Sequence, residues 1–226
     1  MNVSGICELN KPDSCTQEAG SGLFPAMLRR RLSAFGRLAA TTSTELISPD
    51  ESIPVVFASR HGDAHRTLEL LQALASGGDV SPASFSMSVH NAVAGILSIA
   101  RGDTSAVTAV AAADNLLLAA LLEASAQLQD APRVLCVLCD LPLPALYPAI
   151  EDAPTDPWAL ALLLERPEIS GTSGDRYLLQ QAMQVALPAY SSGPALLPLL
   201  QGVVTRLSLQ AGSPGWVLTR REEGLP

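Results

Sequence analysis

Hydrophobic residues recur at helical spacing through much of the first half of the chain, and one strand-like run interrupts them. Apolar side chains three and four residues apart predict a helix over residues 25–45. Residues 53–59 (IPVVFAS) are β-branched and aromatic and predict a buried strand. A helix over 63–75 follows, then a Ser-rich irregular loop at 80–86. A small-residue helix over 87–100 should be buried in the centre of the fold.

The second half continues the alternation of strands and helices. It predicts a buried strand over 107–113, a helix over 116–128, a strand over 134–139 and a proline-containing loop over 141–157. The remaining elements are helices over 158–164, 177–187 and 195–204 and a strand over 216–220. Strands that alternate with helices imply an α/β sandwich with a mainly parallel sheet.

The length of 226 residues suits one domain. Residues 1–22 are polar and are expected to form an N-terminal arm, with room for one short strand, and 23–226 form the single domain. The N-terminus has no basic segment followed by an apolar core, so we expect no signal peptide. No apolar stretch is long enough to span a bilayer. We therefore expect a cytoplasmic protein.

Composition narrows the class of partner. Charged residues make up only 16% of the chain, 48% is hydrophobic and the net charge is −8. This balance excludes a generally basic nucleic-acid binder. A chain this apolar either buries much of itself or keeps a large surface for a partner.

The four cysteines predict neither a metal nor a redox site. Cys136 and Cys139 lie inside a predicted strand, and their odd separation points them to opposite faces. Cys7 and Cys15 are too widely spaced to supply a second zinc-binding pair. Buried structural thiols are the better interpretation, and we expect no metal and no cofactor.

Candidate functional side chains are few. His61 lies at a strand-to-helix turn, where α/β proteins place functional groups, although it could simply cap the helix or meet Asp63. His65 is interpreted as a surface residue. His90 and Asn91 open the small-residue helix, as functional groups or as a hydrogen-bonded polar pair.

A basic cluster, Arg29, Arg30 and Arg31, lies in the first predicted helix. It is either an exposed helix face or a site for a phosphorylated carrier or an acidic partner.

Several motifs together resemble β-ketoacyl synthases. The most specific is SPASFSMSVHNAVAG at residues 81–95, which resembles the region around the nucleophile. VVFASRHG at 55–62, LRRRLS at 28–33 and CDLPLP at 139–144 with Tyr147 support it. Together they are similar to the β-ketoacyl synthase-like N-terminal domain family of small stand-alone proteins. This resemblance implies a thiolase-like half fold, layered α/β/α with a mainly parallel mixed sheet.

The resemblance also places the nucleophile position. Active ketosynthases carry a Cys three residues before the Ser of a Ser-Ala-His tripeptide. Ser88-Val89-His90 takes the place of that tripeptide, so the Cys position falls on Phe85, which has no nucleophilic atom. The family's two further catalytic His come from a C-terminal half, and no His follows His90 here. The resemblance therefore implies no catalysis by this chain itself.

Chain-length factors of type II polyketide systems are ketosynthase relatives of this kind. The resemblance implies a subunit that forms a heterodimer with an active β-ketoacyl-ACP synthase and shapes the acyl or polyene tunnel. The pathway would be bacterial aryl polyene-like polyketide or fatty acid biosynthesis. Phe85 would fill the vacant nucleophile pocket, wall the tunnel or pack in the core. Ser88, His90, Asn91 and His61 would line the pseudo-active site or interface.

Two alternatives stay open. One is an acyl-thioester hydrolase or transferase that uses Ser88 or Ser59 with His61 or His90, although Ser88 and His90 would not face each other on a helix. The other is a scaffold that binds acyl carrier protein through Arg29, Arg30 and Arg31.

Overall fold

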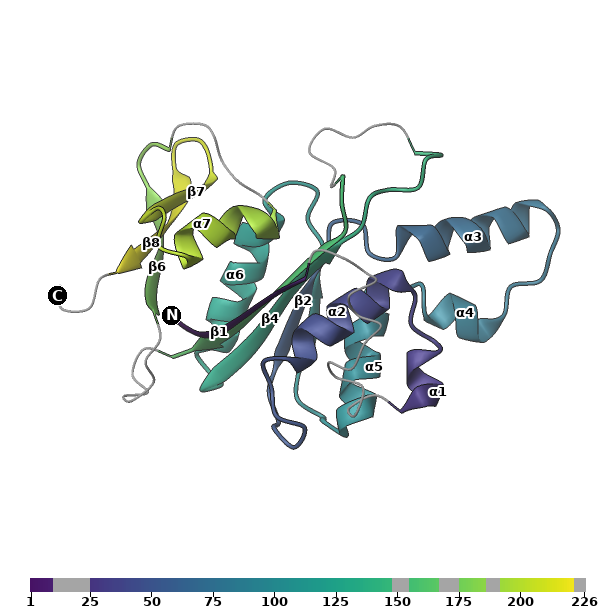
Figure 1. Ribbon diagram of the computed structural model, residues 1–226. Helices are drawn as coiled ribbons and strands as arrows, with labels where there is room; N and C mark the ends of the chain where they lie inside the picture. Colours follow the sequence, from purple (N-terminus) through teal and green to yellow (C-terminus); the bar gives the residue numbers. More distant parts are fainter. Residues whose placement is uncertain (10–24, 148–154, 167–174, 186–191, 222–226) are drawn as a thin grey trace.

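The computed structural model describes residues 1–9, 25–147, 155–166, 175–185 and 192–221. Within these residues one eight-stranded sheet carries helices on both faces (Figure 1). The elements are β1 (Asn2–Leu9), α1 (Ala26–Arg29), α2 (Ala34–Thr44), β2 (Val55–Ala58), α3 (Ala64–Ala75), α4 (Pro82–Ser86), α5 (Ala92–Arg101), β3 (Val107–Val110), α6 (Leu116–Gln127), β4 (Arg133–Asp140), β5 (Trp158–Glu165), β6 (Asp175–Ala182), η2 (Gly193–Leu196), α7 (Leu197–Leu200), β7 (Arg206–Gln210) and β8 (Gly215–Arg221).

The sheet is mixed, with the strand order β3-β2-β4-β5-β1-β6-β8-β7. Only β2 pairs in parallel, with β3 and β4. All other neighbours are antiparallel. The predicted α/β class and mixed sheet are confirmed, but the expectation of a mainly parallel sheet is wrong. The reason is that β5 returns antiparallel beside β4, and that β7 and β8 follow each other in the chain as an antiparallel pair.

The start of the chain belongs to the sheet. Strand β1 lies between β5 and β6, with seven registered pairs to β5. The predicted arm thus contains the one short strand that the sequence analysis allowed, and this strand lies in the interior of the sheet. The rest of the arm, residues 10–22 with Cys15, lies outside the described residues, so the division at residue 22 stays a prediction.

Strand β4 separates two hydrophobic clusters. Cys136 and its alternate neighbours pack under α6, whereas Cys139 and its alternate neighbours pack under α2 and α5. Both thiols are fully buried, and neither forms a disulfide. Burial raises the pKa of the Cys136 thiol to about 12, which keeps it protonated and inert. The prediction of buried structural cysteines on opposite faces is confirmed.

Side-chain caps start helices at two positions that the sequence did not predict. The helix expected over 25–45 divides into α1 and α2, since the Ser33 hydroxyl accepts a hydrogen bond from the Gly36 amide (3.1 Å) and starts a new helix. The loop expected at 80–86 contains α4, which Ser81 caps in the same way through Ser84 (3.0 Å). The small-residue helix starts only at Ala92, so His90 and Asn91 precede it.

Two predicted helices are strands. Residues 158–164 form β5, in which every residue is buried, and residues 177–182 of the helix expected over 177–187 belong to β6. Strand β7 was not predicted, and η2 with α7 covers only part of the helix expected over 195–204. The strand expected at 107–113 is the short edge strand β3, and it is not buried. The other predicted strands and the helices over 63–75 and 116–128 are confirmed, with small differences at their ends.

Arg101-Gly102-Asp103 ties the end of α5 to the segment before β2. Gly102 adopts a left-handed conformation (φ 62°), which favours glycine at a helix end. The buried Asp103 carboxylate accepts hydrogen bonds from the Ile53 amide (3.1 Å) and the Ser105 amide (2.9 Å). The Arg101 guanidinium pairs with it at 3.2 Å and donates to the Glu51 carbonyl. This turn therefore fixes where β2 begins.

Candidate functional site

The segment after β2 is held by a buried polar network. Strands β2 and β4 are parallel neighbours, so their carboxyl ends lie side by side. Ser59 directly follows β2 and Asp140 is the last residue of β4, which places the two residues at this shared end. The Ser59 hydroxyl donates to Asp140 Oδ1 (2.8 Å) and accepts from the Gly62 amide (2.8 Å). The Arg60 amide donates to the same carboxylate oxygen (2.9 Å). Burial raises the pKa of Asp140, although these hydrogen bonds oppose the rise.

His90 closes this network from the other side. Its Nε2 lies 2.9 Å from the Ser59 carbonyl oxygen, and its ring packs edge-on against Phe57 at 5.9 Å between centroids. Gly62 has φ +59°, and a Cβ there would lie 3.3 Å from the His90 ring. His90 is therefore one of the side chains that hold the loop, and glycine suits position 62 for conformation and for space.

His61 lies in the same loop but contributes differently. Its Nε2 is buried and has no hydrogen-bond partner among the described residues. Burial, and then the neighbouring Arg60 charge, lower the pKa of His61. The ring is thus held towards its neutral form, and it neither caps α3 nor meets Asp63. Asp63 itself caps α3 by accepting from the Arg66 amide (3.2 Å).

The residues at the predicted nucleophile position form a surface turn. Phe85 lies on α4 with 62% of its side chain exposed, so it is not a core residue of this chain. The Ser88 hydroxyl donates to the Phe85 carbonyl (2.8 Å). The exposed Asn91 makes no side-chain hydrogen bond that caps α5. Figure 1 shows α3 and α4 extending together away from the sheet.

No Ser–His pair is assembled among the described residues. Ser88 bonds to the Phe85 carbonyl and His90 bonds to the Ser59 carbonyl, so the two do not pair. The predicted reason was different, because neither residue lies on a helix. Ser59 is fully buried, and its hydroxyl donates to a carboxylate rather than to a His. A hydrolase that uses Ser59 or Ser88 would lack the base that activates its hydroxyl.

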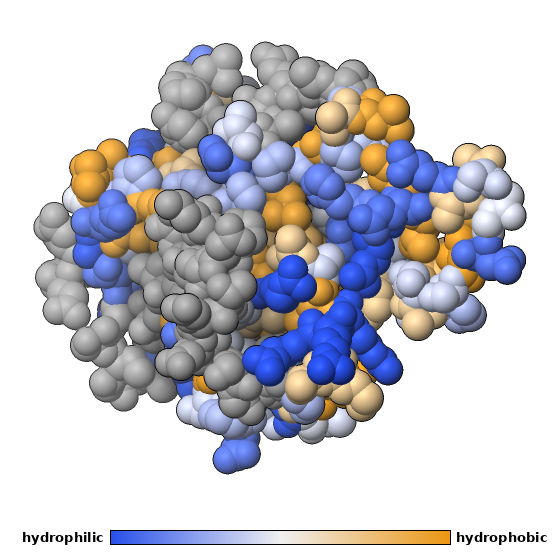
Figure 2. All heavy atoms as spheres, turned by 45° about the vertical axis from the view of Figure 1, so that its right-hand side comes forward, coloured by the Kyte–Doolittle hydropathy of each residue, from blue (hydrophilic) through white to orange (hydrophobic). Residues whose placement is uncertain are grey.

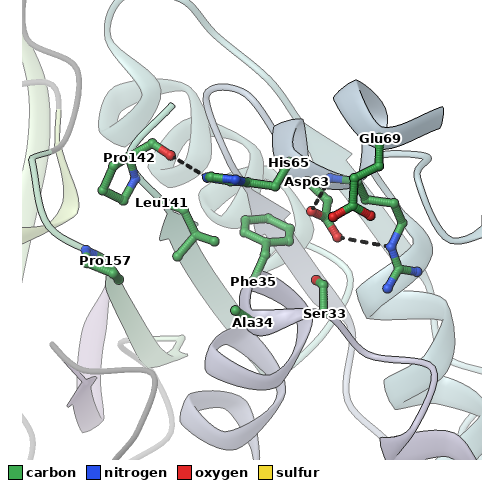
Figure 3. A pocket seen from close by; sticks show the side chains of 10 residues that line it. Ser33, Ala34, Phe35, Asp63, His65, Glu69, Leu141, Pro142 and Pro157 are labelled. Carbon is green, nitrogen blue, oxygen red and sulfur yellow. Dashed lines mark hydrogen bonds and ion pairs between the residues drawn. The ribbon is translucent and has the colours of Figure 1, made fainter. Parts of the chain in front are cut away.

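A pocket that the sequence did not reveal lies beside this loop. It has a volume of about 590 Å³ and combines residues from the starts of α2 and α3 with residues that flank β4 and β5: Ser33, Ala34, Phe35, Asp63, His65, Arg66, Glu69, Leu141, Pro142 and Pro157. Figure 3 shows the His65 ring reaching towards the Pro142 carbonyl, and the two atoms are 2.9 Å apart. His65 is exposed, as predicted, but it is also a wall of this pocket.

The pocket and the site predicted around Phe85 are formed by different residues. Phe85, Ser88 and His90 do not line the pocket. Among the described residues no group of three or more His, Cys, Asp or Glu side chains could hold a metal ion. No helix in the described part of the chain is long and apolar enough to cross a membrane.

Comparison with known proteins now identifies the family. Residues 9–216 match the model of the β-ketoacyl synthase N-terminal domain. The chain belongs to the β-ketoacyl synthase N-terminal domain family. Among curated proteins no match was found.

Solved structures give a fuller view of the family. A ketosynthase (ApeO) in complex with its chain length factor (ApeC) from Xenorhabdus doucetiae contains a chain that is 25% identical, with a TM-score of 0.74. The match covers 97% of this chain and 98% of that one. The protein is therefore similar over nearly its whole length to one chain of such a complex.

Two further structures share the fold at lower identity. The ishigamide ketosynthase/chain length factor is 15% identical with a TM-score of 0.55, over 74% of this chain and 53% of that one. The AntDE:AntF structure, a type II polyketide synthase acyl-carrier protein with its ketosynthase, is 15% identical with a TM-score of 0.58, over 80% and 69%. The chain spans about half the length of the ishigamide chain. The predicted resemblance and thiolase-like α/β fold are thus confirmed.

Proposed function

We propose that the chain is a non-catalytic, chain-length-factor-like subunit that forms a heterodimer with an active β-ketoacyl-ACP synthase. The observation that carries the proposal is Phe85. It occupies the position that the family's motif gives to the nucleophilic Cys, and a phenyl ring cannot form the thioester that a condensation requires. The ring is also 62% exposed, so it is available to a second chain.

The surface around Phe85 supports a partner. Helix α3 has no buried residue along its length, and Leu71 and Leu74 are 52% and 58% exposed. A helix of this length gains most of its stability from packing, so a face left uncovered favours a protein that covers it. Val89, after α4, adds a further exposed apolar side chain.

The similar structures agree with this kind of partner. Both the ApeO/ApeC structure and the ishigamide structure are described as a ketosynthase with a chain length factor. By this analogy the partner is the ketosynthase of the same pathway, in the cytoplasm. The product would be an acyl or polyene chain of an aryl polyene-like polyketide or a fatty acid, and this subunit would help to set its length.

Co-expression tests the proposal directly. The ketosynthase is produced with and without this chain, the complex is measured by size-exclusion chromatography with light scattering, and product length is determined by mass spectrometry. We expect a stable one-to-one complex and a product distribution that depends on this chain. An unchanged product and a monomeric chain would refute the proposal.

Phe85→Ala refines the test within that complex. We expect the truncation to change complex stability or product length, because it removes an apolar anchor of the exposed α4 surface. Met183→Ala is the matched control, since Met183 is also apolar and 88% exposed but follows β6, which lies on the other side of the molecule from α4 (Figure 1). Equal effects of the two substitutions would contradict a role for Phe85.

A further inference from the structure

The pocket beside the loop after β2 has an apolar side and a polar side. Figure 3 shows Leu141, Pro142 and Pro157 along one side. His65 and Glu69 extend from α3 on the other. Because the apolar residues flank β4 and β5, two interior strands hold that side in place. The volume of about 590 Å³ lies within the range of about 300–1,000 Å³ that is typical of small-molecule sites.

The polar side contains a pair of charges that neutralise each other. Asp63 accepts a hydrogen bond from the Arg66 amide (3.2 Å), and its other carboxylate oxygen lies 3.5 Å from Arg66 Nε. The Arg66 guanidinium also donates through Nη2 to the Arg31 carbonyl (3.0 Å). Both charged groups are thus held by the protein itself, and together they give the pocket no net charge.

Two hydrogen-bond acceptors on α3 remain for a ligand. Glu69 lines the pocket, and its carboxylate has no hydrogen bond or ion pair among the described residues. His65 Nε2 must carry a proton, because its partner at 2.9 Å, the Pro142 carbonyl oxygen, can only accept. In the neutral ring Nδ1 is then an acceptor. Residues four apart on a helix are neighbours, so both acceptors belong to one face of α3.

The predicted basic cluster is not part of this pocket. Arg29, Arg30 and Arg31 are exposed on α1 and just after it, and none of them lines the pocket. The lining therefore carries one uncompensated charge, the carboxylate of Glu69. An anion in the pocket would be repelled by this carboxylate, whereas a cation would pair with it.

We propose that this pocket binds a small organic cation with an apolar body. Its ammonium or guanidinium group would donate hydrogen bonds to Glu69 and to Nδ1 of His65, and its apolar part would lie against Leu141 and Pro157. Figure 2 shows hydrophilic and hydrophobic residues next to each other on the side of the molecule that carries α3 and α4, as such a ligand requires. A bare metal ion fits less well, because it would gain nothing from the apolar side.

Three probes of similar shape and different charge test the class of ligand. Phenylbutylamine, phenylbutanol and phenylbutyrate are titrated separately into the isotope-labelled full chain, and the amide signals are followed by NMR. We expect phenylbutylamine to bind about tenfold more tightly than phenylbutanol, because charge-assisted hydrogen bonds are stronger than neutral ones. Phenylbutyrate should bind most weakly. The shifts should centre on the amides of Ala34, His65, Glu69 and Leu141.

Glu69→Gln asks whether the carboxylate selects the ligand. It should weaken phenylbutylamine binding about tenfold and leave phenylbutanol binding unchanged, since the apolar side stays intact. Glu45→Gln is the matched control. Glu45 is also exposed, makes no side-chain hydrogen bond within the described part of the chain, and follows α2 at the end away from the pocket. It should change neither affinity.

Several results would overturn the proposal. These are no binding of any probe, equal binding of all three, tightest binding of phenylbutyrate, shifts centred outside the pocket, or equal losses in the two variants. Displacement of bound phenylbutylamine by the ketosynthase would show that the pocket receives a side chain of the partner, which would also overturn a small-molecule site. Light scattering decides separately whether the heterodimer forms, so each proposal can fail without the other.

Discussion

At the scale of single residues, polar side chains in this protein mainly fix backbone segments. Ser59, Asp140 and His90 hold the loop after β2, and Ser88 bonds within its own turn. A nucleophile needs a free hydroxyl beside a base, whereas the Ser59 hydroxyl already has a donor and an acceptor. Of the residues around the predicted nucleophile position, His90 belongs to this network, whereas Phe85 is exposed.

Asp103 gives a prediction for stability and pH. Burial alone would raise its pKa, but hydrogen bonds from Ser105 and Ile53 and the Arg101 charge outweigh burial and lower the pKa below 3.8. The charged form therefore stabilises the fold above the pKa of the unfolded chain, and this stability is lost as pH falls through the folded pKa. Asp103→Asn should lower the free energy of unfolding at pH 7 by about 1–3 kcal/mol.

Denaturant unfolding from pH 7 down to the acid range measures this effect. The difference between the natural chain and Asp103→Asn should shrink as pH falls below 3.8. Asp130→Asn is the control, because Asp130 is exposed and makes no side-chain hydrogen bond among the described residues. A difference that stays constant with pH would show that Asp103 acts through shape rather than charge.

At the scale of elements, the sequence correctly predicted helices and strands whose hydrophobic residues recur at a clear spacing. It failed on elements without such a spacing. The helices over 63–75 and 116–128 have caps or repeating leucines and were found. Strand β5 (WALALLLE) is buried on both faces, so it shows no polar alternation, and its Ala and Leu content favours a helix locally. Its conformation is decided by pairing with β4 and β1, which are distant in the chain.

The site shows the same limit. The sequence placed Phe85 at a functional turn, but its exposure depends on how α3 and α4 project from the sheet. The pocket of Figure 3 joins residues from position 33 to position 157 and so has no local signal. His61 was predicted at the right loop, whereas its unpartnered buried nitrogen could only be found in three dimensions.

Arg166 gives a prediction for one element, α6. Directly after β5, its guanidinium donates to the carbonyls of Leu128 (2.8 Å), Gln129 (2.8 Å) and Ala131 (3.3 Å), where α6 ends. These carbonyls have no partner within the helix, so Arg166 acts as its C-terminal cap. Arg166→Ala should lower the free energy of unfolding by about 1–3 kcal/mol and speed amide exchange in the last turn of α6.

Thermal unfolding and hydrogen exchange measure the two effects. Arg166→Lys is the matched variant, because an ammonium keeps the charge but cannot reproduce the fork that contacts several carbonyls. The stability of Arg166→Lys and its amide exchange rate in the last turn of α6 should lie between those of the natural chain and Arg166→Ala. If Lys restores full stability, charge at the helix end matters and the specific hydrogen bonds do not.

At the scale of the whole molecule, the described sheet has two edge strands, β3 and β7. Strand β3 pairs with β2, and β2 leads along the chain into α3. Val107 is 37% exposed and Ala109 is exposed, so β3 lacks the cover that a finished edge would have. Unpaired backbone groups of an edge strand are a template for a strand from another chain. We therefore expect the proposed heterodimer to include backbone pairing along β3, which can be measured.

The register of β3 identifies the amides to follow. The amides of Val55 and Ser59 donate to the carbonyls of Ala106 (2.9 Å) and Val110 (3.1 Å), so these groups of β3 face β2. Because backbone groups alternate along a strand, the amides of Val107 and Ala109 face away from β2. They should exchange quickly in the isolated chain and slowly in the ketosynthase complex. The amides of Val55 and Ser59 are hydrogen-bonded within the chain and should be protected in the isolated chain and in the complex. They therefore control for a general decrease in amide exchange on complex formation.

Protection that appears along β7 instead would place the partner at the opposite edge. It would then separate the partner from Phe85, because α4 and β7 lie on opposite sides of the molecule (Figure 1).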